Sequence, residues 1–260
     1  MSETCPAPFV ALAQTLADQS GNVLRRYFRQ PLAIDAKADL SPVTIADREV
    51  ETLLRSAIEA AFPGHGILGE EFGAVRTDAE YVWVIDPIDG TKSFMTGKAT
   101  FGTLIALTRR GSPILGIIDQ PITRERWLGT AGQPTTLNGA PISVRPCARL
   151  ADASLYATTP QMFVGGDAVA FERLMKAVKY PLYGADCYAY GLLASGFTDL
   201  VCEASLQPYD YCALVPVVEG AGGVMSDWEG RPVTIASGGR VLAAGDAALH
   251  GAALALLTAA

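Results

Sequence analysis

The chain has 260 residues, half of them hydrophobic, and its 27 acidic and 20 basic side chains give a formal net charge of −7 at pH 7. This length allows one large domain or two small ones, and the apolar fraction argues against disorder. The acidic balance disfavours general nucleic-acid binding, because neutralising phosphates requires a basic face. It leaves room for a small phosphorylated substrate, since a bound divalent cation can supply positive charge.

The composition of the chain ends argues against a membrane span or a secretory signal. The apolar residues 241–260 are interrupted by Asp246 and His250. The first residues lack a basic region and include Glu3. The five cysteines are scattered and form no CxxC pair, which is typical of reduced core residues. These features predict a cytoplasmic protein.

The first half of the chain begins with helical patterns and continues with extended ones. Apolar residues recur at helical spacing in residues 9–29 and again from about 44 to 62, where Pro63-Gly64 stops the second helix. The short polar stretch between them, residues 33–42, is predicted to be a hairpin or a loop. The predicted strands that follow are 81–85, 103–108, 116–119 and 126–129, with turns at 109–113 and 136–141.

From about residue 151, strands and helices alternate. The predicted elements are a strand at 154–158, helices at 167–178 and 187–195, a strand at 200–203 and a helix at 209–221. The change of pattern predicts two lobes, an N-terminal α+β lobe of residues 1–148 and a C-terminal α/β lobe of residues 149–260. Because the joint is weakly marked, we expect the lobes to share one continuous interface.

Residues 83–94, WVIDPIDGTKSF, end a hydrophobic strand with two carboxylates three residues apart. Asp86 leaves the strand end, a proline stiffens the turn, and Asp89 returns a second carboxylate to the same side. Such a pair suits a hard divalent cation such as Mg²⁺. The backbone N–H groups of Gly90 and Thr91, at a predicted helix start, suit a phosphate. The Asp-Gly-Thr-Lys part alone is equally well explained as a turn, but the twelve-residue segment is not.

Three other segments supply carboxylates, and each has an ordinary explanation when it stands alone. Glu70 and Glu71 follow an apolar pair at a strand end, where a solvated acidic turn is common. Asp47 lies in the first turns of a predicted helix, where it complements the helix dipole. Asp210 begins the helix at 209–221, where it is a natural N-cap. Their joint occurrence, in this order, favours a shared site.

These motifs resemble those of the inositol monophosphatase superfamily of metal-dependent phosphatases. The matching segments are Gly69-Glu70-Glu71, Asp86-Pro87-Ile88-Asp89-Gly90-Thr91, and Asp210 ahead of Glu219-Gly220-Ala221-Gly222-Gly223. The resemblance covers residues 39–227 and implies a layered αβαβα sandwich of mixed α+β and α/β type. Segments 39–44, 92–94, 101–104, 125–127 and 181–190 are similar to the histidinol-phosphate phosphatase branch. The departures, such as Tyr209 where Trp often precedes the aspartate, remove no ligand.

The resemblance implies a site that binds two to three Mg²⁺ ions. One ion would be held by Glu70, Asp86 and the carbonyl of Ile88. A second would be held by Asp86, Asp89 and Asp210, so that Asp86 bridges the two. Clustered like charges repel when no cation is bound, so we expect the metal-free protein to be loosened there.

The catalytic set implied by the resemblance is Asp47, Thr91 and Glu70. A third, weaker Mg²⁺ would lie near Glu70 and Asp47. Thr91 and Asp47 together would orient and deprotonate the attacking water, so no protein nucleophile is needed. The backbone amides of Gly90 and Thr91 would bind the phosphate.

Substrate choice is predicted to come from the C-terminal lobe. Histidinol phosphate carries an ammonium group and an imidazole that Asp186 and Glu203 can bind, whereas an inositol ring favours neutral partners. Asp186 is also explained as the N-cap of the next helix. The predicted substrate contacts are Asp89, Gly90, Thr91, Asp186, Glu203 and Asp210.

The sequence therefore predicts a Mg²⁺-dependent phosphomonoesterase that hydrolyses L-histidinol phosphate in histidine biosynthesis. An inositol-1-monophosphatase or a broad-range phosphatase is the alternative within the same chemistry. A catalytically silent binding module is the alternative from another class, although no ligand carboxylate is missing. We expect no nucleic-acid or membrane partner, and the resemblance implies a homodimer.

Overall fold

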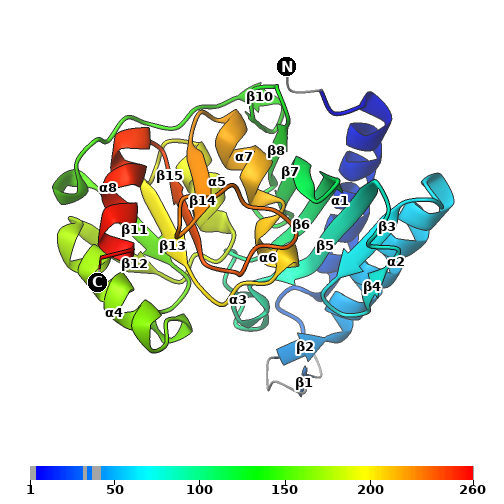
Figure 1. Cartoon of the computed structure of the whole chain (residues 1–260). Coiled ribbons are helices and arrows are strands. Elements are labelled where there is room, and N and C mark those ends of the chain that lie inside the picture. Colours follow the sequence, from blue (N-terminus) through cyan, green and yellow to red (C-terminus); the bar gives the residue numbers. More distant parts are fainter. Residues whose placement is uncertain (1–3, 32–33, 37–41, 260) are drawn as a thin grey trace.

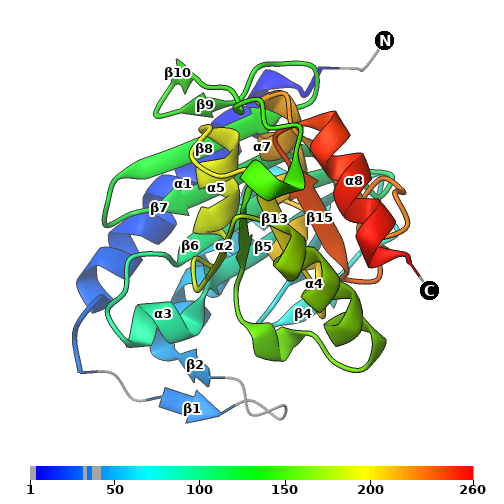
Figure 2. The same ribbon diagram turned by 90° about the vertical axis from the view of Figure 1, so that its left-hand side faces the viewer.

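The protein is described by a computed structural model that covers residues 4–31, 34–36 and 42–259. Within these residues, the two large β-sheets alternate with three layers of helices (Figures 1 and 2). Buried hydrophobic side chains form three clusters: one under the first outer helices, one around the middle helices and one under the last helices. The predicted layered αβαβα sandwich is confirmed.

The larger sheet has eight strands and is antiparallel except for one pair, β3 with β5. Its strands, in spatial order, are β10 (Ala140–Pro141), β9 (Thr136–Leu137), β8 (Glu125–Thr130), β7 (Ser112–Gln120), β6 (Gly102–Arg109), β5 (Tyr81–Asp89), β3 (Gly66–Gly69) and β4 (Gly73–Val75). Along β5, Val82 and Val84 pack into the middle cluster, whereas Trp83 and Ile85 pack under the outer helices. Both faces are buried, which explains why this strand reads as an unbroken apolar run.

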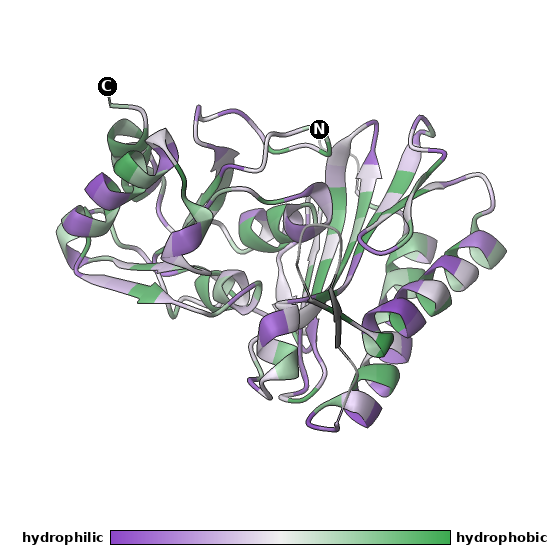
Figure 3. Cartoon of the chain, turned by 90° about the horizontal axis from the view of Figure 1, so that it is seen from below, coloured by the Kyte–Doolittle hydropathy of each residue, from purple (hydrophilic) through white to green (hydrophobic). Residues whose placement is uncertain are grey.

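Two amphipathic helices, α1 (Ala7–Tyr27) and α2 (Ile45–Ala61), cover the outer face of this sheet. In Figure 3 the helices at the right edge carry both hydrophobic residues, in green, and hydrophilic residues, in purple. Thr44 caps α2 through a capping box with Asp47, so this helix begins where the sequence predicts. Before it, β1 (Ile34–Ala36) and β2 (Pro42–Thr44) pair antiparallel, and the rest of the predicted hairpin lies outside the described residues.

The smaller sheet has five strands, in the order β12 (Tyr180–Tyr183), β11 (Ser154–Ala157), β13 (Leu200–Glu203), β15 (Val241–Ala244) and β14 (Val224–Asp227). Two helices, α4 (Gly166–Ala177) and α8 (Ala247–Leu257), cover its outer face. Two short 3₁₀ turns, Leu150–Asp152 and Pro160–Met162, flank β11.

The middle layer contains α5 (Tyr188–Ala194), α6 (Pro208–Tyr211) and α7 (Leu214–Gly220). The prediction of one helix over 209–221 is wrong, because the chain breaks it between Tyr211 and Leu214. In a continuous helix, the backbone N–H at position 216 would donate a hydrogen bond to a carbonyl of the preceding turn. Pro216 has no N–H, so it fits only in the first turn of a new helix. α6 and α7 belong to the predicted C-terminal lobe, but they pack on the larger sheet, which belongs to the predicted N-terminal lobe. The division at residue 148 stays a prediction.

Candidate metal and phosphate site

The site begins at the carboxyl end of β5, where an irregular register separates Asp86 from Asp89. The backbone N–H of Ile88 donates to Asp86 Oδ1 at 2.9 Å, which closes a tight turn around the buried carboxylate. The hydroxyl of Thr103 on β6 donates to the carbonyl of Pro87 at 2.9 Å. The strand therefore extends through the whole Asp-Pro-Ile-Asp segment and presents both aspartates at one edge of the sheet.

Gly90 follows with a φ of +82°, in the left-handed region that glycine adopts without strain. A Cβ at this position would lie 2.8 Å from Cγ of Asp186, so glycine also permits a close approach. The short helix α3 (Thr91–Met95) begins at the next residue. The Thr91 hydroxyl donates to the carbonyl of Ile88 at 3.2 Å.

Asp210 reaches the same edge from α6. Its Oδ2 accepts the backbone N–H of Gln207 at 2.7 Å in a capping box, so it sits in the first helical turn rather than at the N-cap. One carboxylate oxygen each from Asp86, Asp89 and Asp210 lie within 4.8 Å of one another. Burial, together with the neighbouring charges, raises the pKa of Asp86 and Asp89 well above the usual range. It raises the pKa of Asp210 to about 7.

Glu70 stands on the turn between β3 and β4, and its charge contributes to the raised pKa of both Asp86 and Asp210. Asp47 lies on the first turn of α2, and burial is the main cause of its raised pKa. The charge of Glu70 raises this pKa further. Oδ2 of Asp47 accepts the N–H and the hydroxyl of Thr44 at 2.8 and 2.6 Å. Within the described part of the chain, its buried Oδ1 has no hydrogen-bond partner.

These observations fit a hard divalent cation. Buried carboxylates that crowd together are unfavourable unless cations or donors compensate them. An unpartnered buried oxygen on Asp47 and a trio of converging carboxylates are the oxygen-rich surroundings that Mg²⁺ prefers. Within the described ranges, the aspartate trio is the only such group of three potential ligands.

A cavity of about 220 Å³ opens beside the trio. Its lining includes seven of the predicted site residues: Glu70, Asp89, Gly90, Thr91, Asp186, Glu203 and Asp210. Sequence reasoning did not assign the other lining residues, which are Lys92, Thr158, Met162, Cys187, Tyr190, Leu206 and Leu214. Most are apolar or aromatic, so only their spatial position distinguishes them from core residues.

Asp186 faces the cavity in a left-handed conformation with a φ of +49°. Its Oδ2 accepts hydroxyl hydrogen bonds from Ser93 at 2.5 Å and Thr100 at 3.0 Å. The explanation of Asp186 as an N-cap is wrong, because Cys187 occupies the N-cap position of α5. The backbone N–H of Cys187 instead donates to Oδ2 of Asp89 at 2.7 Å, which ties α5 to the trio.

Glu203 ends β13 on the opposite wall and is buried. One carboxylate oxygen accepts the N–H and the hydroxyl of Thr158 at 3.0 and 2.5 Å. The other accepts the Tyr190 hydroxyl at 3.0 Å, so this tyrosine is more than a packing residue. Burial raises the pKa of Glu203.

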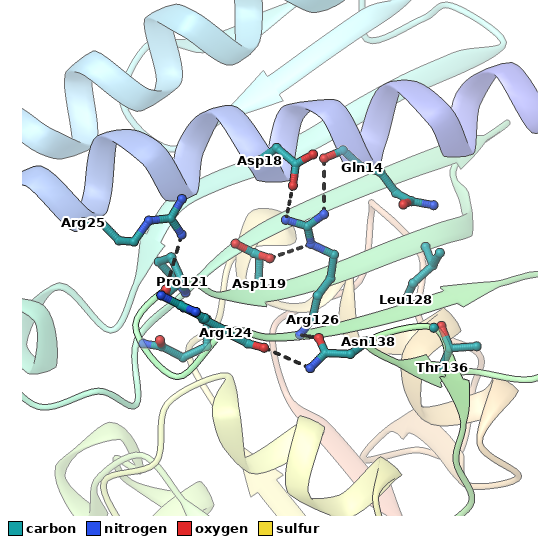
Figure 4. Close-up of a pocket in the computed structure, with 12 residues that line it drawn as sticks. Gln14, Asp18, Arg25, Asp119, Pro121, Arg124, Arg126, Leu128, Thr136 and Asn138 are labelled. Carbon is teal, nitrogen blue, oxygen red and sulfur yellow. Dashed lines mark hydrogen bonds and ion pairs between the residues drawn. The ribbon is translucent and has the colours of Figure 1, made fainter.

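A larger cavity of about 400 Å³ lies between α1 and the β7–β8 turn (Figure 4). There Arg126 bridges two aspartates, Asp119 at 2.6 Å and Asp18 at 2.8 Å. The charge of Arg126 is offset by these carboxylates, and the cavity lies on the α1 side of the sheet. It therefore does not share the chemistry of the aspartate trio.

A carboxylate trio beside a small cavity is typical of enzymes that use metal ions to hydrolyse phosphate esters. A model of the inositol monophosphatase family matches residues 6–260. The chain belongs to this family, whose members are Mg²⁺-dependent phosphoric monoester hydrolases that act on small phosphorylated substrates.

Individual relatives agree with this assignment. The chain is 52% identical to "Bifunctional phosphatase IMPL2, chloroplastic" of Arabidopsis thaliana, over 98% of this chain and 76% of that protein. It is 34% identical to a histidinol-phosphatase of Chlorobaculum parvum, over 91% and 92% of the two chains. It superposes on an inositol monophosphatase structure from Zymomonas mobilis with a TM-score of 0.89 and 48% identity, over 96% and 97% of the chains. None of the helices described here is both long and apolar enough for a bilayer crossing.

Proposed function

We propose that this chain is a cytoplasmic, Mg²⁺-dependent histidinol-phosphatase that converts L-histidinol phosphate into L-histidinol and phosphate in histidine biosynthesis. The observation that carries the proposal is the pairing of the aspartate trio with two further carboxylates, Asp186 and Glu203, on one cavity. Carboxylates there suit the ammonium and imidazole of histidinol phosphate. The five free cysteines fit the cytoplasmic location.

The residues divide the chemistry as follows. Glu70, Asp86 and the Ile88 carbonyl would hold one Mg²⁺, and Asp86, Asp89 and Asp210 would hold a second. When bound there, Mg²⁺ would supply positive charge for the phosphate and for the leaving oxygen. The cavity supports this division, because Glu70, Asp89 and Asp210 line it and a carboxylate oxygen of Asp86 converges with those of Asp89 and Asp210.

Asp47 and Thr91 act on the attacking water, and a third, weaker Mg²⁺ would lie near Glu70. The Thr91 hydroxyl donates a hydrogen bond to the Ile88 carbonyl, so its oxygen can accept a hydrogen bond from the water. The unpartnered Oδ1 of Asp47 is the available base. The amides of Gly90 and Thr91 hold the phosphate in place.

Asp186 and Glu203 distinguish this substrate from a neutral polyol phosphate. Support comes from histidinol-phosphatases of Chlorobaculum parvum and Mycobacterium tuberculosis, the latter 37% identical over 84% of this chain. The Zymomonas mobilis structure, titled an inositol monophosphatase, supports the alternative that inositol-1-phosphate or a range of esters is hydrolysed.

A panel assay separates these substrates. We expect a higher specificity constant for histidinol phosphate than for inositol-1-phosphate or glycerol-2-phosphate. An equal or higher constant for inositol-1-phosphate would reject the proposed substrate. Phosphate release that stops on adding EDTA and returns with Mg²⁺ would reject a catalytically silent binding module. Sedimentation velocity tests the proposed homodimer.

A further inference from the structure

A buried glutamate on α2 fastens the turn that carries Glu70. Glu51 is fully buried, and its carboxylate accepts the backbone N–H of Glu71 at 2.7 Å and that of Phe72 at 3.1 Å. Arg55, one helical turn further along α2, donates from Nε to the same carboxylate at 2.7 Å. These donors compensate a charge that would otherwise be very costly to bury.

The turn itself is shaped to receive this carboxylate. Gly69 and Gly73 pair across it, and Gly73 adopts a φ of +69°. A Cβ on Gly69 would lie 2.1 Å from Oε1 of Glu51, so only glycine lets the carboxylate approach this closely. Arg55 also donates to the carbonyl of Gly73. Hydrogen bonds to residues 71–73 therefore attach the turn to α2, which lies beside β3 and β4 in Figure 1.

This attachment bears directly on the orientation of Glu70. The N–H of Glu71 belongs to the planar peptide unit that follows Glu70. Holding this N–H therefore holds the orientation of the backbone at Glu70. Glu70 lines the same cavity as Asp89 and Asp210. Asp47 lies four residues before Glu51 on the same face of α2. A single helix face therefore holds Asp47 and the turn of Glu70 together.

We propose that Glu51 is a positioning residue for the magnesium site, because it sets where the Glu70 carboxylate lies relative to Asp86 and Asp47. This inference rests on the proposed role of Glu70 as a ligand. Outer partners that orient metal ligands change metal affinity by about 10–100-fold when they are mutated. A loosened Glu70 turn should weaken Mg²⁺ binding within that range.

The test uses Glu51→Gln in the full chain. Glutamine keeps the shape but replaces one acceptor oxygen with a donor, which then faces a backbone N–H or the Arg55 guanidinium. Mg²⁺ is titrated calorimetrically into the metal-free protein, and amide hydrogen exchange is followed in residues 66–75. We expect Mg²⁺ binding at least about tenfold weaker and faster exchange in this segment. Glu59→Gln, on the same helix in an exposed pair with Arg76, is the matched control and should change neither.

Glu70→Gln separates this inference from the ligand assignment. If Glu70→Gln weakens Mg²⁺ binding and Glu51→Gln does not, the positioning role is refuted and the ligand assignment stands. If Glu70→Gln leaves Mg²⁺ binding unchanged, the ligand assignment fails, and the positioning role fails with it. Should Glu51→Gln not fold, Arg55→Gln removes the Arg55 hydrogen bonds to the turn and to Glu51, and must show the same loss. Lower stability with unchanged Mg²⁺ affinity would reduce Glu51 to an ordinary structural residue.

Discussion

The raised pKa of Asp210 predicts how the metal-free protein responds to pH. Asp210 shares its site with Asp86 and Asp89, and burial is the largest cause of its raised pKa. When no cation is bound, the folded state resists ionisation of this group, whereas the unfolded chain ionises it freely. Asp210→Asn removes the charge and keeps an oxygen for the N–H of Gln207. We expect this variant to stabilise the metal-free protein at alkaline pH.

The sign and the size follow from linkage between protonation and folding. The pKa of Asp210 is about 7 in the folded protein, against about 3.9 for an unfolded aspartate. Between these two pH values the folded state binds more protons than the unfolded state. The contribution of Asp210 to the free energy of unfolding is therefore greatest below about pH 4 and is lost as pH rises through about 7. A shift of about three units corresponds to about 4 kcal/mol. Because the side chain is partly exposed and titrates together with Asp86, we expect about half, roughly 2 kcal/mol, to be measurable.

The assay is urea unfolding in EDTA at about pH 5 and about pH 8, on the wild type and Asp210→Asn. The gain in the free energy of unfolding should appear at the higher pH and shrink at the lower one. Asp78→Asn, at an exposed position, controls for the change in net charge. With excess Mg²⁺ the order should reverse, because the wild type gains binding energy that the variant lacks. A variant no more stable than wild type at the higher pH would refute the account of a crowded, charge-repelling trio.

Three other substitutions test separate parts of the account. Asp186→Asn should lower kcat/KM for histidinol phosphate by at least about tenfold and leave a neutral polyol phosphate nearly unaffected; an equal loss on both in the panel assay would contradict its role in selection. Gly90 has a φ of +82° and lies against the Asp186 side chain. Gly90→Ala should therefore lower the free energy of unfolding by about 1–3 kcal/mol and impair phosphate release. Wild-type values for both would contradict the close approach. Arg126→Met leaves Asp119 buried without its cation and should cost about 3–5 kcal/mol in urea unfolding, whereas Arg110→Met, in an exposed pair, should stay within about 0.5 kcal/mol.

Much of the fold follows from local sequence patterns. The buried strand β5 and the capped helix that begins after Thr44 carry strong local signals, and both begin where these signals predict, although β5 continues to Asp89. The elements that the patterns did not resolve are short or uniformly apolar. β15 and α8 form one Ala-rich stretch with hardly any periodicity, and the edge strand β12 is exposed throughout. Periodicity cannot reveal elements whose two faces have the same composition.

The site could be predicted as a set of residues but not as an arrangement. The sequence indicates that Asp86, Asp89 and Asp210 carry chemistry, yet spacing along the chain does not say which backbone groups hold them. It gave no reason to single out Glu51, because an interior helix glutamate is usually solvated. Its burial results from contacts with a turn about twenty residues away. The hydrogen bonds of Asp186 likewise span more than eighty residues.

Four carboxylates of the site share one arrangement that explains why they stay close together before a cation binds. Each gives one oxygen to a nearby backbone N–H: Asp47 to Thr44, Asp86 to Ile88, Asp89 to Cys187 and Asp210 to Gln207. These bonds fix the position of each side chain and leave a second oxygen for the centre of the site. Folding therefore sets the arrangement of these side chains, and burial together with the remaining repulsion raises the pKa values of Asp86 and Asp89. We expect a cation that binds there to relieve this repulsion with little reorganisation of the chain, which favours binding.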